Sequence, residues 1–260
     1  MIEPSSSSQP PAQPQSNPVR VEPVRVALRM PVTTPWVTYA IMGVTIAVFL
    51  AQQASQMFLG GDWPAALGMK INEYIIAGQY WRLFTPALLH AGWVHIGFNM
   101  YALFSFGRGL ERSYGHSRFF LLYLLGAFAG NVASFWMSAN PSLGASTAVF
   151  GLVAAEGIYF YQNRKIYGKQ TAGVLQNIGF VIVINLFYGF TTATIDNWGH
   201  LGGLFGGAIF AFLAGPVFEI EGFVPDLRLV DKRGPLLHWL VALVEGAGIA
   251  LIASFKLLGR

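Results

Sequence analysis

The sequence predicts an all-α protein that crosses a membrane several times. Hydrophobic residues make up 54% of the 260 residues and charged residues only 11%, whereas a soluble domain has about a quarter charged residues. Apolar stretches near the ~20 residues that a helix needs to cross a bilayer follow one another along the chain. So few charges cannot cover a water-facing surface, so we expect most of the surface to face lipid.

Residues 1–31 differ from everything after them. They contain seven prolines, the serine run Ser5 to Ser8 and three glutamines, without any apolar periodicity. Such a segment buries too little surface to offset the entropy lost on ordering. We therefore expect a disordered cytoplasmic tail.

Seven apolar stretches follow this tail. A connection of about 40 residues, with Trp63, Trp81 and Phe84, separates the first two, and we expect it to lie in the membrane interface. The approximate limits of the stretches are 36–53, 93–112, 117–139, 146–163, 173–191, 198–216 and 236–258.

The positive charges predict how these stretches are oriented. Twelve of the 16 Lys and Arg residues lie on the side of the N-terminus, and such residues concentrate on the cytoplasmic side. We therefore expect the N-terminus inside and the C-terminus outside, so the net charge of +4 needs no nucleic acid to explain it. The four on the other side are Lys70, Arg82, Lys256 and Arg260.

Polar residues from three stretches are expected at one depth, near the outer surface. They are His95 and Asn99 of the second stretch, Ser146 of the fourth and His200 of the sixth. Polar groups inside a membrane are costly and usually functional. Because His95 and Asn99 are four residues apart, they share one helix face.

Small residues predict that the fourth and sixth stretches touch. Gly199, Gly203 and Gly207 repeat every four residues, and Gly144 and Gly151 flank Ser146. Such faces let helix backbones approach closely.

Close contact at this point would bring the Ser146 hydroxyl within reach of the His200 imidazole, as a nucleophile and its general base require. Ser146 also begins a helix, whose free N–H groups stabilise an oxyanion. His95 and Asn99 are candidate side-chain donors to the same charge.

Other protease classes lack their residues. A membrane zinc protease needs a His-Glu-x-x-His helix, and His90 and His95 are five residues apart with no Glu between them. An aspartyl protease needs two carboxylates sharing a proton, and no acidic pair shares a depth. The chain has no cysteine. Asp196 fits a helix cap better than a third catalytic residue.

Five motifs occur in order between residues 81 and 207. They are Trp81-Arg82, the run from His90 to Asn99, Gly107 to Gly115 with Glu111 and then Arg118-Phe119, Gly144 to Thr147, and Gly199 to Gly203. Together they resemble the rhomboid family of intramembrane serine proteases.

The resemblance implies a fold of six helices over residues 32–216, with an inner loop and a seventh transmembrane helix in residues 217–260. It implies that Ser146 attacks, that His200 is the base, and that His95, Asn99 and the Ser146 backbone N–H form the oxyanion hole. Phe150 matches an aromatic position that stacks on the catalytic histidine. Gly144 and His90 belong to the same motifs as supporting residues.

The family's substrates are membrane-spanning proteins, cut near the outer end of their helix in the lipid bilayer. The resemblance implies the same partners here, with no cofactor, no metal and no nucleic acid. The short loops and the six-plus-one form favour a bacterial cytoplasmic membrane.

One residue departs from the family pattern. Thr147 stands where the family usually has glycine, and its side chain is expected to crowd the nucleophile and to offer Ser146 a competing hydrogen bond. It is the only sequence support for a non-catalytic membrane binding protein on the same scaffold. A transporter would need inverted repeats, which the sequence lacks.

Three residues keep open roles. His90 fits a structural or water-binding role as well as a catalytic one. Glu111 is expected to pair or cap at the inner end of the second stretch. No function is assigned to Glu245.

Overall fold

The computed structural model describes residues 33–223 and 225–259, and the predicted tail of residues 1–31 lies outside them. Each of the seven apolar stretches is helical. The corresponding elements are α1 (Trp36–Leu59), α4 (Trp93–Ala102) continued by η3 (Leu103–Gly107) and α5 (Arg108–Tyr114), α6 (His116–Met137), α7 (Ser146–Gln162), α9 (Gln170–Thr191), α10 (Asn197–Ala214) and α11 (Leu237–Leu258).

Four of the described helices are long and apolar enough to cross a membrane by length and composition, namely α1, α6, α9 and α11. The helices α7 and α10 are shorter, with 17 and 18 residues. The second predicted span is interrupted by the π-helical turn η3. At this turn Gly107 lies against α1, since a Cβ at Gly107 would be 3.0 Å from Thr38 Cγ2.

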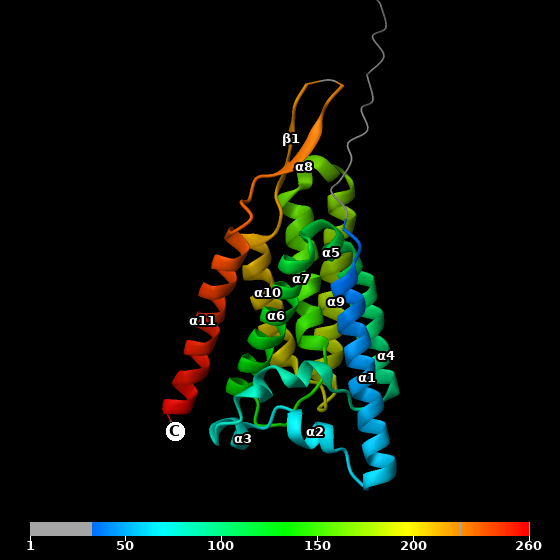
Figure 1. Cartoon of the computed structure of the whole chain (residues 1–260), viewed down its shortest axis with the longest axis vertical. Helices are drawn as coiled ribbons and strands as arrows, with labels where there is room; N and C mark the ends of the chain where they lie inside the picture. Colours follow the sequence, from blue (N-terminus) through cyan, green and yellow to red (C-terminus); the bar gives the residue numbers. More distant parts are fainter. Residues whose placement is uncertain (1–32, 224, 260) are drawn as a thin grey trace, which may run out of the picture.

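The helices lie side by side in one bundle (Figure 1). At one end, the connection after α1 forms α2 (Trp63–Gly68), α3 (Asn72–Ile76) and the 3-10 turns η1 (Tyr80–Leu83) and η2 (Thr85–Leu88). At the other end are α8 (Arg164–Tyr167) and an antiparallel hairpin of β1 (Phe218–Glu221) and β2 (Arg228–Asp231). We call these the α2–α3 end and the hairpin end. The sequence reading placed only a loop where the hairpin forms.

The centre of the bundle is built from α6, α7 and α10. Of the 18-residue apolar part of α6, 67% is buried inside the bundle, against 11% of the corresponding part of α9. The small residues bring the backbones of α7 and α10 into contact as predicted, since a Cβ at Gly207 would overlap the Gly151 backbone. They also bring α10 close to α6, where a Cβ at Gly202 would lie 2.7 Å from the Ala129 carbonyl oxygen. Any larger side chain at these positions would push the helices apart.

Glu111 joins α5 to the start of α1. Its carboxylate accepts hydrogen bonds from Val37 N at 2.8 Å, Thr38 N at 2.7 Å and Thr38 Oγ1 at 2.6 Å. The N-cap residue of α1 is Pro35, which offers no side-chain acceptor. Glu111 therefore satisfies the free N–H groups of α1 from a distant helix, and the prediction that it caps or pairs at this end is confirmed.

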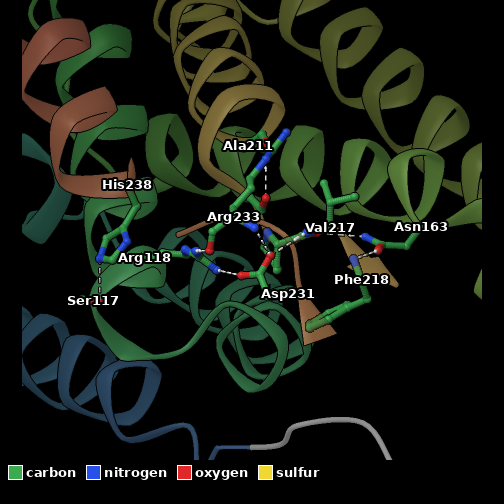
Figure 2. Close-up of polar contacts among 11 residues, drawn as sticks. Ser117, Arg118, Asn163, Ala211, Val217, Phe218, Asp231, Arg233 and His238 are labelled. Atoms are coloured by element: carbon green, nitrogen blue, oxygen red, sulfur yellow. Dashed lines mark hydrogen bonds and ion pairs between the residues drawn. The ribbon is translucent and has the colours of Figure 1, made fainter. Parts of the chain in front are cut away.

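Polar contacts at the hairpin end hold the segment before α11 (Figure 2). Arg118 of α6 forms an ion pair with Asp231 of β2, and Arg233 donates to the Gly215 carbonyl at the end of α10. Asn163 Oδ1 accepts from Phe218 N at 2.8 Å. The hairpin is thereby tied to α6, α7 and α10.

The last helix, α11, packs less closely than the central three. A cavity of about 620 Å³ lies between α6, α10 and α11. Glu245 lines it, and neither of its carboxyl oxygens has a hydrogen-bond partner within the described part of the chain. In this arrangement α11 is an addition to the bundle, and the candidate site is built without it.

Candidate active site

Ser146 and His200 meet at the α2–α3 end of the bundle. Ser146 is the first residue of α7, and His200 lies in the first turn of α10. Ser146 Oγ and His200 Nε2 are 2.8 Å apart, a good hydrogen bond. Two residues 54 positions apart are thus placed as a nucleophile and a base need to be.

The spacing of α7 and α10 is set directly below this pair. A Cβ on Gly203 would overlap the carbonyl group of Thr147, and a Cβ on Gly151 would lie 3.1 Å from the Gly203 carbonyl oxygen. The two helix axes can approach this closely only because both positions are glycine. The glycine pattern of the sequence therefore fixes the distance between Ser146 and His200.

The His200 imidazole is held by a ring and a helix start. The ring of Phe150, one turn after Ser146, stacks on it at 4.3 Å with an interplanar angle of 12°. Asp196 Oδ1 accepts from Gly199 N at 2.9 Å and so caps α10, as the sequence predicted. Within the described residues, His200 Nδ1 has no hydrogen-bond partner. No acidic side chain in the described part of the chain therefore accepts a hydrogen bond from this nitrogen.

Gly144 makes room for His95 beside Ser146. Its φ of 138° is in a region that favours glycine. A Cβ there would lie 2.9 Å from both Cε1 and Nε2 of His95 and 3.6 Å from Ser146 Oγ. His95 Nε2 therefore faces the space next to the hydroxyl, where an oxyanion donor must lie.

Asn99 is buried on the same helix, but its amide is directed along the helix. Its Nδ2 donates to the backbone carbonyl of His95 at 3.0 Å. No hydrogen bond joins Asn99 to Ser146 among the described residues. Its second amide proton is still available, so its place in the oxyanion hole stays a prediction.

His90 supports the segment that carries Ser146. Its ring is 1% exposed and lies 5.1 Å from the His95 ring. His90 Nε2 accepts from Ala145 N, the residue before Ser146, at 3.4 Å. Burial lowers the pKa of His90 to about 3, so the ring is neutral and able to accept this bond. These contacts favour a structural role over a catalytic one.

Gln52 is a neighbour that the sequence reading missed. It lies in α1, is fully buried, and bonds both the backbone N–H and the carbonyl of His90. The available signal was an amide side chain within an apolar stretch, where a polar group needs a partner.

Thr147 does not make the hydrogen bond that the sequence predicted. Its Oγ1 has no partner within the described residues, and its side chain lies between α6 and α10. A Cβ on Gly130 would be 2.8 Å from Thr147 Cγ2, and one on Gly199 would be 3.1 Å from it. The expectation of a competing bond to Ser146 is wrong, because the side chain is directed into the packing between helices.

The connection after α1 braces the site from outside. Arg82, 2% exposed, donates to the carbonyls of Met69 and Ala66 at 2.7 and 2.8 Å and so stabilises this loop. Trp81 Nε1 donates to the Leu67 carbonyl at 3.0 Å.

Lys70 joins the same connection to the segment before Ser146. Its Nζ donates to the carbonyls of Ser138 and Asn140, and its backbone pairs with Ser142. Burial lowers the pKa of Lys70 to about 8. Among residues 33–223 and 225–259, no three His, Cys, Asp or Glu side chains gather closely enough to hold a metal ion.

Known proteins resemble this chain over its central part. Residues 77–217, more than half of the chain, match the family model described as the Rhomboid domain. Rhomboid protease GluP of Bacillus subtilis is 41% identical over 212 residues, which is 82% of this chain and 40% of that protein.

Two plant proteins are similar over a shorter range. RHOMBOID-like protein 1 of Arabidopsis thaliana is 40% identical over 187 residues, 68% of this chain and 48% of its own length. RHOMBOID-like protein 2 of the same plant is 32% identical over 187 residues, 58% of its length. The chain thus spans about half the length of these relatives. Together with the four helices able to span a membrane, the match makes the chain a multi-pass membrane protein.

Proposed function

The chain belongs to the rhomboid family, and we propose that it is an intramembrane serine endopeptidase with Ser146 as nucleophile and His200 as general base. The observation that carries this proposal is the 2.8 Å hydrogen bond between Ser146 Oγ and His200 Nε2 inside an apolar helical bundle. A relative named rhomboid protease, 41% identical, supports the same activity.

In the first step, Ser146 Oγ bonds to the carbonyl carbon of the scissile peptide while His200 Nε2 takes the hydroxyl proton. Negative charge moves onto the carbonyl oxygen. The donors we assign to it are the Ser146 backbone N–H at the free end of α7, the ring N–H of His95 and the unused amide proton of Asn99.

In the second step, the C–N bond breaks and His200 gives its proton to the leaving amine. A water molecule then attacks the acyl carbon while His200 takes a proton from it. The bond from that carbon to Ser146 Oγ breaks, His200 returns the proton to Oγ, and the new carboxyl group is released. The proposal uses a dyad because His200 Nδ1 has no partner in the described chain. Stacking on Phe150 supplies the orientation that a third residue gives elsewhere.

The substrates we propose are membrane proteins cut near the outer end of a transmembrane helix. This assignment is supported by the position of Ser146 and His200 at the first turns of α7 and α10, close to one end of the bundle. Because nine of the twelve Lys and Arg residues in the described part of the chain lie toward the hairpin end, and only Lys70, Arg82 and Lys256 toward the other, we assign the hairpin end to the cytoplasm. The α2–α3 end then faces outward from a bacterial cytoplasmic membrane.

Labelling with a fluorophosphonate tests the proposal without knowledge of the substrate. In this reaction the Ser146 Oγ–P bond forms, the P–F bond breaks, fluoride leaves and His200 takes the proton. We expect the purified protein to be labelled at Ser146, and neither Ser146→Ala nor His200→Ala to be labelled.

The matched control is Ser117→Ala. Ser117 Oγ also lies near a histidine ring nitrogen, that of His238 at 3.1 Å, but at the hairpin end. This variant is expected to be labelled like the parent. Undiminished labelling of Ser146→Ala would overturn the proposal, because another residue would then be the labelled nucleophile. An unlabelled parent would instead leave a non-catalytic binding protein, for which Thr147, directed away from Ser146, gives no support.

A further inference from the structure

Gln52 connects α1 to the site through three hydrogen bonds. Its Oε1 accepts from His90 N at 3.0 Å, and its Nε2 donates to the His90 carbonyl at 3.2 Å. The same Nε2 donates to Asp62 Oδ2 at 2.8 Å. Both ends of the amide are engaged, so Gln52 holds one orientation.

The peptide unit between His90 and Ala91 carries this constraint to His95. Its carbonyl accepts from Gln52, and its N–H, on Ala91, donates to His95 Nδ1 at 3.4 Å. A trans peptide unit is planar, with C=O and N–H pointing in opposite directions. By fixing the carbonyl on one side, Gln52 aims the N–H at the His95 ring on the other.

That N–H decides which nitrogen of His95 carries the proton. A neutral imidazole has one donor and one acceptor nitrogen. Since Nδ1 accepts from Ala91, the proton resides on Nε2. Nε2 is the atom that faces Gly144 and the Ser146 hydroxyl, so the proton is placed where a developing oxyanion needs a donor.

The bonds form a connected series from a carboxylate to the site. Asp62 also accepts from Ala65 N at 3.0 Å and so caps α2, which keeps its carboxylate in place. A carboxylate that accepts from Gln52 polarises the amide, and each bond in such a series strengthens the next.

We propose that Gln52 is a positioning residue for catalysis, which holds the His90–Ala91 peptide so that His95 presents a protonated Nε2 to the oxyanion. The inference rests on the proposed serine protease function. It adds a residue of α1 to the machinery, outside residues 77–217 that match the family model.

Kinetics of fluorophosphonate labelling measure the effect. Loss of one oxyanion donor lowers the rate about 100- to 1,000-fold. A mixture of His95 tautomers keeps the donor in part of the molecules, so it lowers the rate by less. For Gln52→Met we expect kinact, the labelling rate at saturating reagent, to fall by about 10- to 100-fold. KI, the reagent concentration that gives half this rate, should change less than about twofold, because Gln52 touches no bound reagent. An unchanged kinact would overturn the inference.

The matched control is Gln56→Met, one turn further along α1. Gln56 donates to the same Asp62 Oδ2, at 3.1 Å, but does not reach His90. Its replacement removes a bond to Asp62 from the same helix, so its kinact should stay within twofold of the parent. A loss as large as that of Gln52→Met would overturn the inference by assigning the effect to Asp62.

A second readout does not depend on activity. In protein labelled with ¹⁵N-histidine, ring nitrogens with and without a proton have distinct chemical shifts, and His95→Ala identifies the His95 signals. We expect His95 in the parent to carry its proton on Nε2, and in Gln52→Met to show both tautomers. An unchanged tautomer would overturn the inference even if kinact fell. If the parent were not labelled at Ser146, the proposed function would fail, and the tautomer would still report on Gln52.

Gln52→Glu keeps the shape of the side chain and tests the same bonds if Gln52→Met does not fold. A protonated carboxyl accepts from His90 N, as the amide does, and has one proton to donate to the His90 carbonyl or to Asp62, where the amide has two. An ionised carboxylate at position 52 is repelled by the His90 carbonyl oxygen and by the Asp62 carboxylate. Relative to the parent at each pH, kinact of Gln52→Glu should therefore recover as the pH falls. A ratio independent of pH would contradict the proposed bonds.

Discussion

The described part of the chain contains two hydrogen-bonded serine–histidine pairs, one at each end of the bundle. At the α2–α3 end Ser146 and His200 are 2.8 Å apart, and at the hairpin end Ser117 and His238 are 3.1 Å apart (Figure 2). Both serines lie in the first turn of a helix, α7 or α6. A hydrogen-bonded serine and histidine at a helix start are therefore not sufficient to define a candidate active site.

The two pairs even share a local sequence pattern. A glycine with positive φ lies two residues before each serine, with φ of 138° at Gly144 and 77° at Gly115. The difference lies in what surrounds the glycine. A Cβ on Gly144 would meet the His95 ring at 2.9 Å, whereas a Cβ on Gly115 would meet nothing within 4 Å. Of these two glycines, only Gly144 makes room for a candidate oxyanion donor.

The residue after each serine also differs. Thr147 is directed into the helix packing at α6 and α10. Arg118 instead pairs with Asp231, which anchors the hairpin. The proposed chemistry is thus at the α2–α3 end, where small residues bring helices together. At the hairpin end, an ion pair holds the hairpin to α6.

Replacing Gly144 or Gly115 by alanine should give the largest difference between the two ends of the bundle in the rate of labelling. In Gly144→Ala the new methyl group would displace His95, and φ would be strained for alanine. We expect kinact of fluorophosphonate labelling to fall by about 100-fold, the cost of one oxyanion donor.

Gly115→Ala is the matched control, since it brings a similar backbone strain without a neighbour to displace. It should lower thermal stability slightly and leave kinact of the folded protein within twofold. Equal losses of kinact in the two variants would mean that position 144 requires glycine because of backbone strain and not because of the room for His95.

The sequence predicted much of this site because its residues lie on regular helices. Glycines at intervals of four residues predicted the contact of α7 with α10. The positions of Ser146 and His200 near the starts of two apolar stretches that run in the same direction placed them at one depth. The seven apolar stretches match helices to within a few residues, except that α1 continues to Leu59.

What the sequence did not predict depends on contacts in irregular segments. The bonds of Gln52 to His90 require the course of a connection that no periodicity encodes. The direction of the Thr147 side chain depends on Gly130, a residue on another helix. The hairpin of β1 and β2 has strands of four residues each, too short for a clear alternation.

Arg118→Leu tests the assignment of the hairpin end to tethering. It removes the ion pair with Asp231, whose side chain is 21% exposed, and leaves that carboxylate without its cation. We expect a loss of about 2 kcal/mol in stability, since the pair is only partly buried. The exposed pair of Arg228 and Glu221 provides the control, because Arg228→Ala should cost less than about 0.5 kcal/mol.

Thermal unfolding in detergent measures these losses, and labelling of the molecules that remain folded measures the site. For Arg118→Leu the melting temperature should drop by several degrees with kinact unchanged. A loss of kinact without a loss of stability would show that the hairpin end acts on the site, and the contrast between the two ends would fail.

Thr147→Val gives the smallest effect and sharpens the contrast at the outer end. Valine keeps the shape that fills the space beside Gly130 and Gly199, and removes a buried hydroxyl that has no partner within the described residues. An unsatisfied buried polar group costs about 1–3 kcal/mol, so we expect a gain of about 1 kcal/mol, or about 2–4 °C in melting temperature. Because the hydroxyl does not bond Ser146, kinact should stay within twofold of the parent. A clear rise in kinact would instead mean that the hydroxyl competes for Ser146, so that this position restrains the nucleophile as well as packing the helices.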